Sequence, residues 1–206
     1  MDDGFSDRRR RGVVCSVHID ALRAQWAHPH SGRPSPVFHG LQALADGLLL
    51  LTPVALLIVG WRRDRGRTAG WDQVALQAAL GVGLVSLLKY PLKFAFGRTW
   101  PATFHENHRS LLHDGVYGFY PSQGGVAHSA FPSGHAAVAA TVIWHTDPRY
   151  WALAVLLELA VAVGLLGAYD HFAGDTLTGA GLGVFVASLV IRFGDRTPAK
   201  ETETHD

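Results

Sequence analysis

The charged residues of this chain are confined to short segments that separate long, almost uncharged stretches. Four stretches carry at most one charged residue each: 41–59, with Asp46; 74–88; 150–169, with Glu158; and 176–191. A helix of about 20 apolar residues is long enough to cross the hydrocarbon core of a bilayer, which is about 30 Å thick. Segregation of this kind therefore predicts several membrane-spanning helices joined by polar loops.

We expect an all-α integral membrane bundle of about five spans, over residues 41–61, 71–90, 133–144, 150–169 and 175–191. The third span is short, because a helix over 133–144 is about 18 Å long. It cannot cross the core alone, so Ser133 and His135 should lie below the membrane surface in a cavity lined by protein. We assign residues 1–40 to a tail or an interfacial amphipathic segment, 41–193 to the helical domain, and 194–206 to a polar tail.

Tryptophans and arginines indicate how the spans are oriented. Trp61 and Trp71 flank one expected loop, and Trp144 and Trp151 flank another, as in an interfacial aromatic belt, although core positions are the alternative. The arginines within 62–67 favour a cytoplasmic loop, which puts the ends of the spans that carry polar motifs on the outer face. We expect a bacterial inner (cell) membrane protein. Cys15 is the single cysteine, so no intrachain disulfide can form.

The third span opens with Pro132-Ser133-Gly134-His135. Ser133 can cap the helix, and Gly134 lets a ligand approach the backbone. The free N–H groups of a helix amino terminus form an anion site, which a histidine one residue further on can also reach. A plain capped helix with a buried histidine explains the tetrapeptide equally well.

His171 and Asp175 lie four residues apart at the start of the last span. A carboxylate on one imidazole nitrogen fixes the tautomer and leaves the other nitrogen as a nucleophile or base. A satisfied polar pair between helices is the simpler alternative. Ionisable residues inside membranes are expensive, however, and this favours a functional role.

Lys93 and Arg98 close the second span. Cations there are also explained by side chains that reach the interface, and we interpret Lys89 in this way and leave it outside the site. The order Lys93, Arg98, Pro101, then Pro-Ser-Gly-His, then His171 and Asp175, resembles the type 2 phosphatidic acid phosphatase superfamily. That superfamily shares its helical fold with vanadium haloperoxidases. The resemblance covers about residues 41–193.

Two positions depart from the pattern of that superfamily. Its first motif places an arginine before the proline, where this chain has Trp100, and Arg98 lies two residues earlier. Its third motif opens with Ser-Arg, where this chain has Gly164 and Leu165. Two phosphate-binding arginines of the family are therefore absent.

The resemblance implies hydrolysis of a phosphomonoester or diphosphate of a lipid through a phosphohistidine. His171 would be the nucleophile, Asp175 would hold its imidazole, and His135 would protonate the leaving oxygen. The implied phosphate-binding residues are Lys93, Arg98, Ser133 and Gly134. Residues that would shape the substrate entrance are Trp100, His105, His108, Arg109 and Tyr117.

The expected partners are a phosphorylated lipid and the bilayer, with no nucleic acid and no cofactor. Two other functions use the same fold: a non-catalytic membrane protein that binds phosphorylated lipid, and a lipid phosphotransferase. A metal site is a further alternative, because His105, His108 and His113 share one loop with Asp114.

Overall fold

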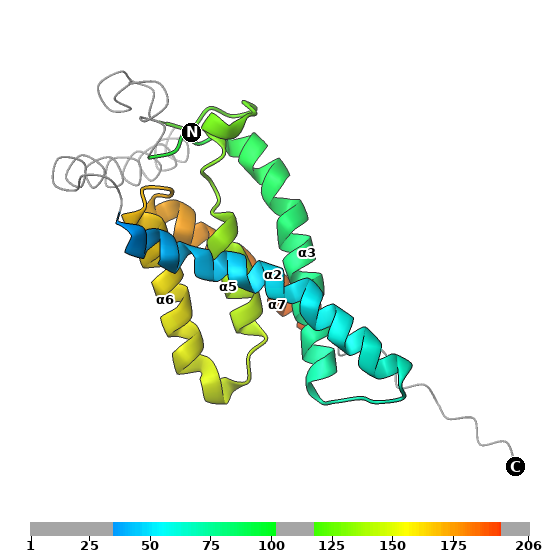
Figure 1. The fold of residues 1–206 in the computed structure, drawn as a ribbon. Helices are drawn as coiled ribbons and strands as arrows, with labels where there is room; N and C mark the ends of the chain where they lie inside the picture. Colours follow the sequence, from blue (N-terminus) through cyan, green and yellow to red (C-terminus); the bar gives the residue numbers. More distant parts are fainter. Residues whose placement is uncertain (1–34, 102–117, 195–206) are drawn as a thin grey trace, which may run out of the picture.

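The computed structural model describes residues 35–101 and 118–194, and every regular element in these residues is a helix (Figure 1). The long helices are α2 (Pro36–Asp64), α3 (Trp71–Phe96), α6 (Trp151–Gly167) and α7 (Ala173–Gly194). The shorter helix is α5 (Gly134–Trp144), and two 3₁₀ turns are η1 (Val126–His128) and η2 (Pro148–Tyr150). The all-α prediction is confirmed.

Four of the helices are long and apolar enough to cross a membrane: α2, α3, α6 with the preceding turn, and α7. The helix α5 is too short, as its sequence predicts. Two boundaries differ from the prediction. The helix α2 already begins at Pro36, because Ser35 accepts a hydrogen bond from the Val37 amide. The helix α3 continues through Pro91 to Phe96, where Gly97 ends it with a left-handed φ of 57°.

The short helix α5 packs against all four long helices and forms the centre of the bundle. Its small side chains, Ala136, Ala137, Ala139 and Ala140, are buried. Large apolar side chains point outward from the long helices instead, among them Leu50, Leu57, Leu87, Leu153, Leu177 and Phe185. Such an outer surface suits lipid rather than water, because a soluble protein rarely exposes apolar patches of this extent.

Glycines on α7 let α5 approach closely. A Cβ on Gly183 would lie 2.3 Å from the Ala137 carbonyl oxygen, and a Cβ on Gly179 would lie 2.3 Å from the Ser133 carbonyl oxygen. Gly181, between them, has nothing within 4 Å of its Cβ position. This is the spacing of small residues that brings membrane helices together.

The two ends of the bundle are formed by different helix ends and loops (Figure 1). The ends of α3 and α6 and the starts of α5 and α7 meet at one end, and the α2–α3 and α5–α6 loops lie at the other. At the loop end, Trp144 and Trp151 stack with ring centroids 5.8 Å apart. A hydrogen bond from the Arg149 side chain holds the pKa of the exposed Asp147 down to about 2. The polar motifs predicted to form a site are therefore together at one end, away from the arginine-rich loop.

Candidate active site

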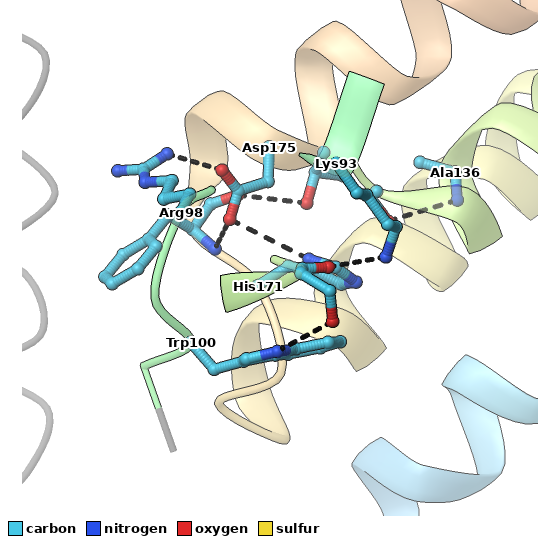
Figure 2. Close-up of polar contacts among 10 residues, drawn as sticks. Lys93, Arg98, Trp100, Ala136, His171 and Asp175 are labelled. Atoms are coloured by element: carbon cyan, nitrogen blue, oxygen red, sulfur yellow. Dashed lines mark hydrogen bonds and ion pairs between the residues drawn. The ribbon is translucent and has the colours of Figure 1, made fainter. Parts of the chain in front are cut away.

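A carboxylate between a guanidinium and an imidazole forms the core of the site (Figure 2). Asp175 Oδ1 accepts a hydrogen bond from Arg98 Nη1, and Asp175 Oδ2 lies 3.7 Å from His171 Nδ1. All three residues are at most 2% exposed. Since the carboxylate is on the Nδ1 side of the ring, Nε2 of His171 is the nitrogen that can attack a substrate.

The backbone fixes both members of the His171–Asp175 pair. His171 lies just before α7, and its amide donates to the Leu165 carbonyl oxygen at 3.3 Å. Asp175 lies in the first turn of α7, where Oδ2 accepts a hydrogen bond from the Phe172 amide at 2.9 Å. A carboxylate in the first turn also suits the positive end of the helix dipole. The pair is thus held before any substrate arrives.

Arg98 is built into the structure beside Asp175. Its backbone pairs with Phe119 in an isolated bridge, and its carbonyl oxygen accepts a hydrogen bond from Ala130. Its guanidinium lies 4.9 Å from the Phe119 ring centroid and 4.3 Å from that of Phe172. We predicted Arg98 as a phosphate-binding residue. Its position supports a second role, the neutralisation of a buried carboxylate, and phosphate contact stays a prediction.

The amino terminus of α5 adjoins this pair. Ser133 caps the helix as predicted, because its Oγ accepts a hydrogen bond from the Ala136 amide at 3.4 Å. The Ser133 amide donates to the Asp175 carbonyl oxygen at 3.0 Å, which ties α5 to α7. In the described part of the chain, no hydrogen bond from the Gly134 or His135 amide is found. These amides remain available to an anion.

Trp100 occupies the position where the superfamily pattern has an arginine, and it contacts the site. Its ring centroid is 4.9 Å from that of His171, and its Nε1 donates to Ser129 Oγ at 3.3 Å. Lys93 Nζ lies 5.3 Å from the Trp100 ring centroid and donates to the Ser129 carbonyl oxygen at 2.5 Å. Trp100 therefore lies against the His171 ring and contacts Lys93 beside it.

The second departure from the pattern is explained by packing. A Cβ on Gly164 would lie 2.5 Å from the Gln42 backbone nitrogen, so a serine there would push α2 away from α6. The Leu165 side chain is fully buried against Ala136, Ala139 and other apolar residues. A leucine and a glycine at these positions allow α2 to pack closely against the bundle.

The close packing of α2 also places at the site a residue, Asp46, that the sequence analysis did not assign to it. Asp46 on α2 places Oδ1 3.2 Å from His135 Nε2, and the His135 ring centroid is 6.4 Å from that of His171. The structure thus brings both predicted histidines together and adds a carboxylate to the second. The sequence contained one indication of a functional role for Asp46, because it is the single charged residue of its span. Its partner could not be predicted, because that depends on how α2 packs.

Lys89 was left outside the predicted site, yet it lies beside the α5 amino terminus. Its Cδ is 3.2 Å, and its Nζ 3.7 Å, from the Cβ position of Gly134. Lys89 and Lys93 line one cavity of about 470 Å³, together with residues of the 123–129 segment. Spacing along α3 shows that the two lysines share a face, but not that this face meets α5.

Four predicted entrance residues lie outside the described residues: His105, His108, Arg109 and Tyr117. The same holds for the alternative metal ligands His113 and Asp114. Among residues 35–101 and 118–194, no group of three His, Cys, Asp or Glu side chains is arranged to hold a metal ion.

Comparison with known proteins agrees with this architecture. The PAP2 superfamily model matches residues 74–198, more than half of the chain, so the chain belongs to the PAP2 superfamily. Its structure is similar to that of a transmembrane PAP2-type phosphatidylglycerolphosphate phosphatase from Bacillus subtilis, with a TM-score of 0.60 and 21% identity. The match covers 89% of this chain and 88% of that chain. No curated protein matches the sequence.

The family resemblance drawn from the motifs is therefore confirmed. Four apolar helices of spanning length and a transmembrane structural neighbour with the same fold make this an integral membrane protein.

Proposed function

We propose that this protein is a phosphatase that hydrolyses a phosphomonoester or diphosphate of a membrane lipid through a phosphohistidine intermediate. The observation that carries the proposal is the His171–Asp175 pair, buried and held by the backbone next to a helix amino terminus with unused amides. A buried nucleophile, an orienting carboxylate and an anion site are the parts that phosphoryl transfer through histidine requires.

In the first step, His171 Nε2 attacks phosphorus, and the bond from phosphorus to the leaving oxygen breaks. Asp175 stabilises the positive charge that forms on the imidazole, and Arg98 forms an ion pair with the same carboxylate. His135 donates a proton to the leaving oxygen, which departs as an alcohol or as the shorter phosphate.

In the second step, a water molecule attacks phosphorus, and the bond between phosphorus and His171 breaks. His135, now neutral, takes the proton from this water, so each turnover restores both histidines. Asp46 is a positioning residue in this scheme, because its carboxylate is at hydrogen-bond distance from His135 Nε2. Lys93, the Ser133 hydroxyl and the Gly134 amide bind the oxygens of the transferred phosphoryl group.

The surroundings of the site support a lipid as the substrate. The surface around the bundle is apolar along the long helices, so a lipid can reach the site by lateral diffusion in the bilayer. We place the protein in the cell membrane of a bacterium, with the site on the outer face, because the arginine-rich α2–α3 loop lies at the other end of the bundle.

A second function is favoured by a specific observation. Trp100 and Leu165 stand where the superfamily pattern has phosphate-binding arginines, and a protein that only binds phosphorylated lipids would tolerate their loss. Transfer of the phosphoryl group to another lipid would use the same residues and differ only in the acceptor.

The test is phosphate release by the purified, detergent-solubilised protein from a panel of phosphorylated lipids, with a chelator present. We expect release by the wild type and none by His171→Ala, because the mutant lacks the nucleophile. Equal activity of the two proteins would refute the histidine mechanism. Binding of the lipids without release by the wild type would favour the binding protein.

A further inference from the structure

A cavity of about 470 Å³ lies beside the candidate active site, between the carboxyl-terminal part of α3 and the 123–129 segment. Its polar side chains come from Lys89, Lys93, Gln123, His128 and Ser129. Tyr90 and Phe94, which also line it, are largely exposed on the outer face of α3. The cavity therefore has a cationic wall on one side and, on the other, an aromatic edge that is exposed on the outer surface of α3.

Lys89 and Lys93 form the cationic wall of this cavity. Lys89 and Lys93 are one helical turn apart on α3, so both side chains lie on one face. Among the described residues, no carboxylate forms an ion pair with either of them. Two adjacent ammonium groups repel each other, and an anion between them would relieve that repulsion.

The wall connects the cavity to the catalytic groups at two points. Lys93 reaches the Trp100 ring, which in turn contacts His171. Lys89 Nζ lies within 3.7 Å of the Cβ position of Gly134, at the amino terminus of α5. The cavity therefore shares Lys93 with the candidate phosphate site and adjoins the amino terminus of α5.

We propose that this cavity binds a second anionic group of the lipid headgroup, with Lys89 as its charge partner. The substrate class is then a lipid that carries two negative groups in sequence, either a diphosphate or a phosphomonoester joined to a phosphodiester. This inference rests on the proposed phosphatase function and narrows it. Lys89 also adds positive charge beside the amino terminus of α5, in a chain that lacks two arginines of the superfamily pattern.

The experiment compares two pairs of substrates that differ by one anionic group. One pair is a prenyl diphosphate and the matching prenyl monophosphate; the other is phosphatidylglycerol phosphate and phosphatidate. For each lipid, kcat/KM for phosphate release is measured with the wild type, Lys89→Gln and Lys89→Arg. The control is Arg149→Gln, which removes an exposed positive charge at the other end of the bundle.

We expect Lys89→Gln to lower kcat/KM for the lipid with two anionic groups about tenfold more than for the matching lipid with one. A tenfold loss is about what the removal of one hydrogen bond to a charged group causes. Lys89→Arg should retain most of the preference, and Arg149→Gln should leave it unchanged. A change in the diphosphate pair alone identifies a diphosphate as the ligand, and a change in the other pair alone identifies a phosphodiester. An equal loss within both pairs would overturn the inference.

A binding measurement separates this inference from the proposed function. With the His171→Ala protein, the lipid with two anionic groups should raise the melting temperature more than its partner does, and the added Lys89→Gln change should abolish that difference. If the wild type releases no phosphate at all, the phosphatase proposal fails, and this measurement alone decides whether the cavity binds the second anion. An equal rise for both lipids would contradict it.

Discussion

The contact between α5 and α7 provides a prediction with an internal control. Gly179, Gly181 and Gly183 lie on the same helix, but only the first and third face α5. A methyl group on Gly183 would meet the Ala137 carbonyl oxygen at 2.3 Å, the Ala140 Cβ at 2.9 Å and a backbone nitrogen at 3.0 Å. Ordinary contact between carbon atoms is about 3.5–4.0 Å, so α5 and α7 must separate to admit it.

The magnitude follows from two opposing effects. Overpacking of a closely packed contact costs about 1–3 kcal/mol, whereas Gly→Ala within a helix returns about 0.8–1.0 kcal/mol. Gly183→Ala should therefore be neutral to destabilising by about 2 kcal/mol, and Gly181→Ala should stabilise by about 1 kcal/mol. Because about 1 kcal/mol shifts Tm by about 2–4 °C for a chain of this size, the two variants should differ by several degrees.

The assay is thermal unfolding of purified protein in one detergent, followed by phosphate release at a temperature where each variant is folded. Gly179→Ala should lower both stability and activity, because its methyl group would displace the Ser133 carbonyl oxygen at the start of α5. Equal melting temperatures for Gly181→Ala and Gly183→Ala would refute the reasoning, since they would show that Gly183 is no more needed for the contact than Gly181.

Three further predictions concern the charged groups and the orientation. Asp46→Asn should reduce kcat about tenfold or more with little change in KM, and Asp46→Glu should restore part of it; a change in KM alone would contradict the positioning role. Arg98→Gln should cost about 3–5 kcal/mol of stability in thermal unfolding, because it leaves a buried carboxylate unpaired; unchanged stability with a raised KM would show instead that Arg98 contacts phosphate. After replacement of Cys15, a cysteine at the exposed Gly124 should react with an impermeant reagent in intact cells, and one at the exposed Thr68 only after lysis; the reverse pattern would invert the proposed orientation.

Helix positions could be predicted from the sequence because membrane spans are encoded locally. Nearly uncharged stretches located the four long helices of the described residues, and Ser133 marked the start of α5 through ordinary capping chemistry. The boundaries at Pro36 and Phe96 were less accurate, because Ser35 caps α2 before the predicted start and Pro91 does not end α3. Whether a proline ends a membrane helix depends on neighbouring segments rather than on the proline itself.

The composition of the site was harder to predict, because it depends on contacts between distant segments. Lys89 resembles a side chain that reaches for the interface until α5 is placed beside it. Asp46 could not be matched with His135 before the α2–α6 contact was known. In the sequence, Trp100 was only a departure from the superfamily pattern, which has an arginine there. In the structure, its ring contacts both His171 and Lys93.

The hydrogen bond from the Ser133 amide to the Asp175 carbonyl oxygen has a consequence for how such a protein can change in evolution. It joins the amino terminus of α5 to the start of α7 through main-chain atoms, so no side-chain substitution removes either partner except a proline at residue 133. His171, which we propose as the nucleophile, and the amides proposed to bind phosphate are thus inherited as one rigid unit. Changes in substrate preference therefore have to occur around this unit, in α2, in α3 and in the 118–131 segment. There, side chains determine which substrate is bound.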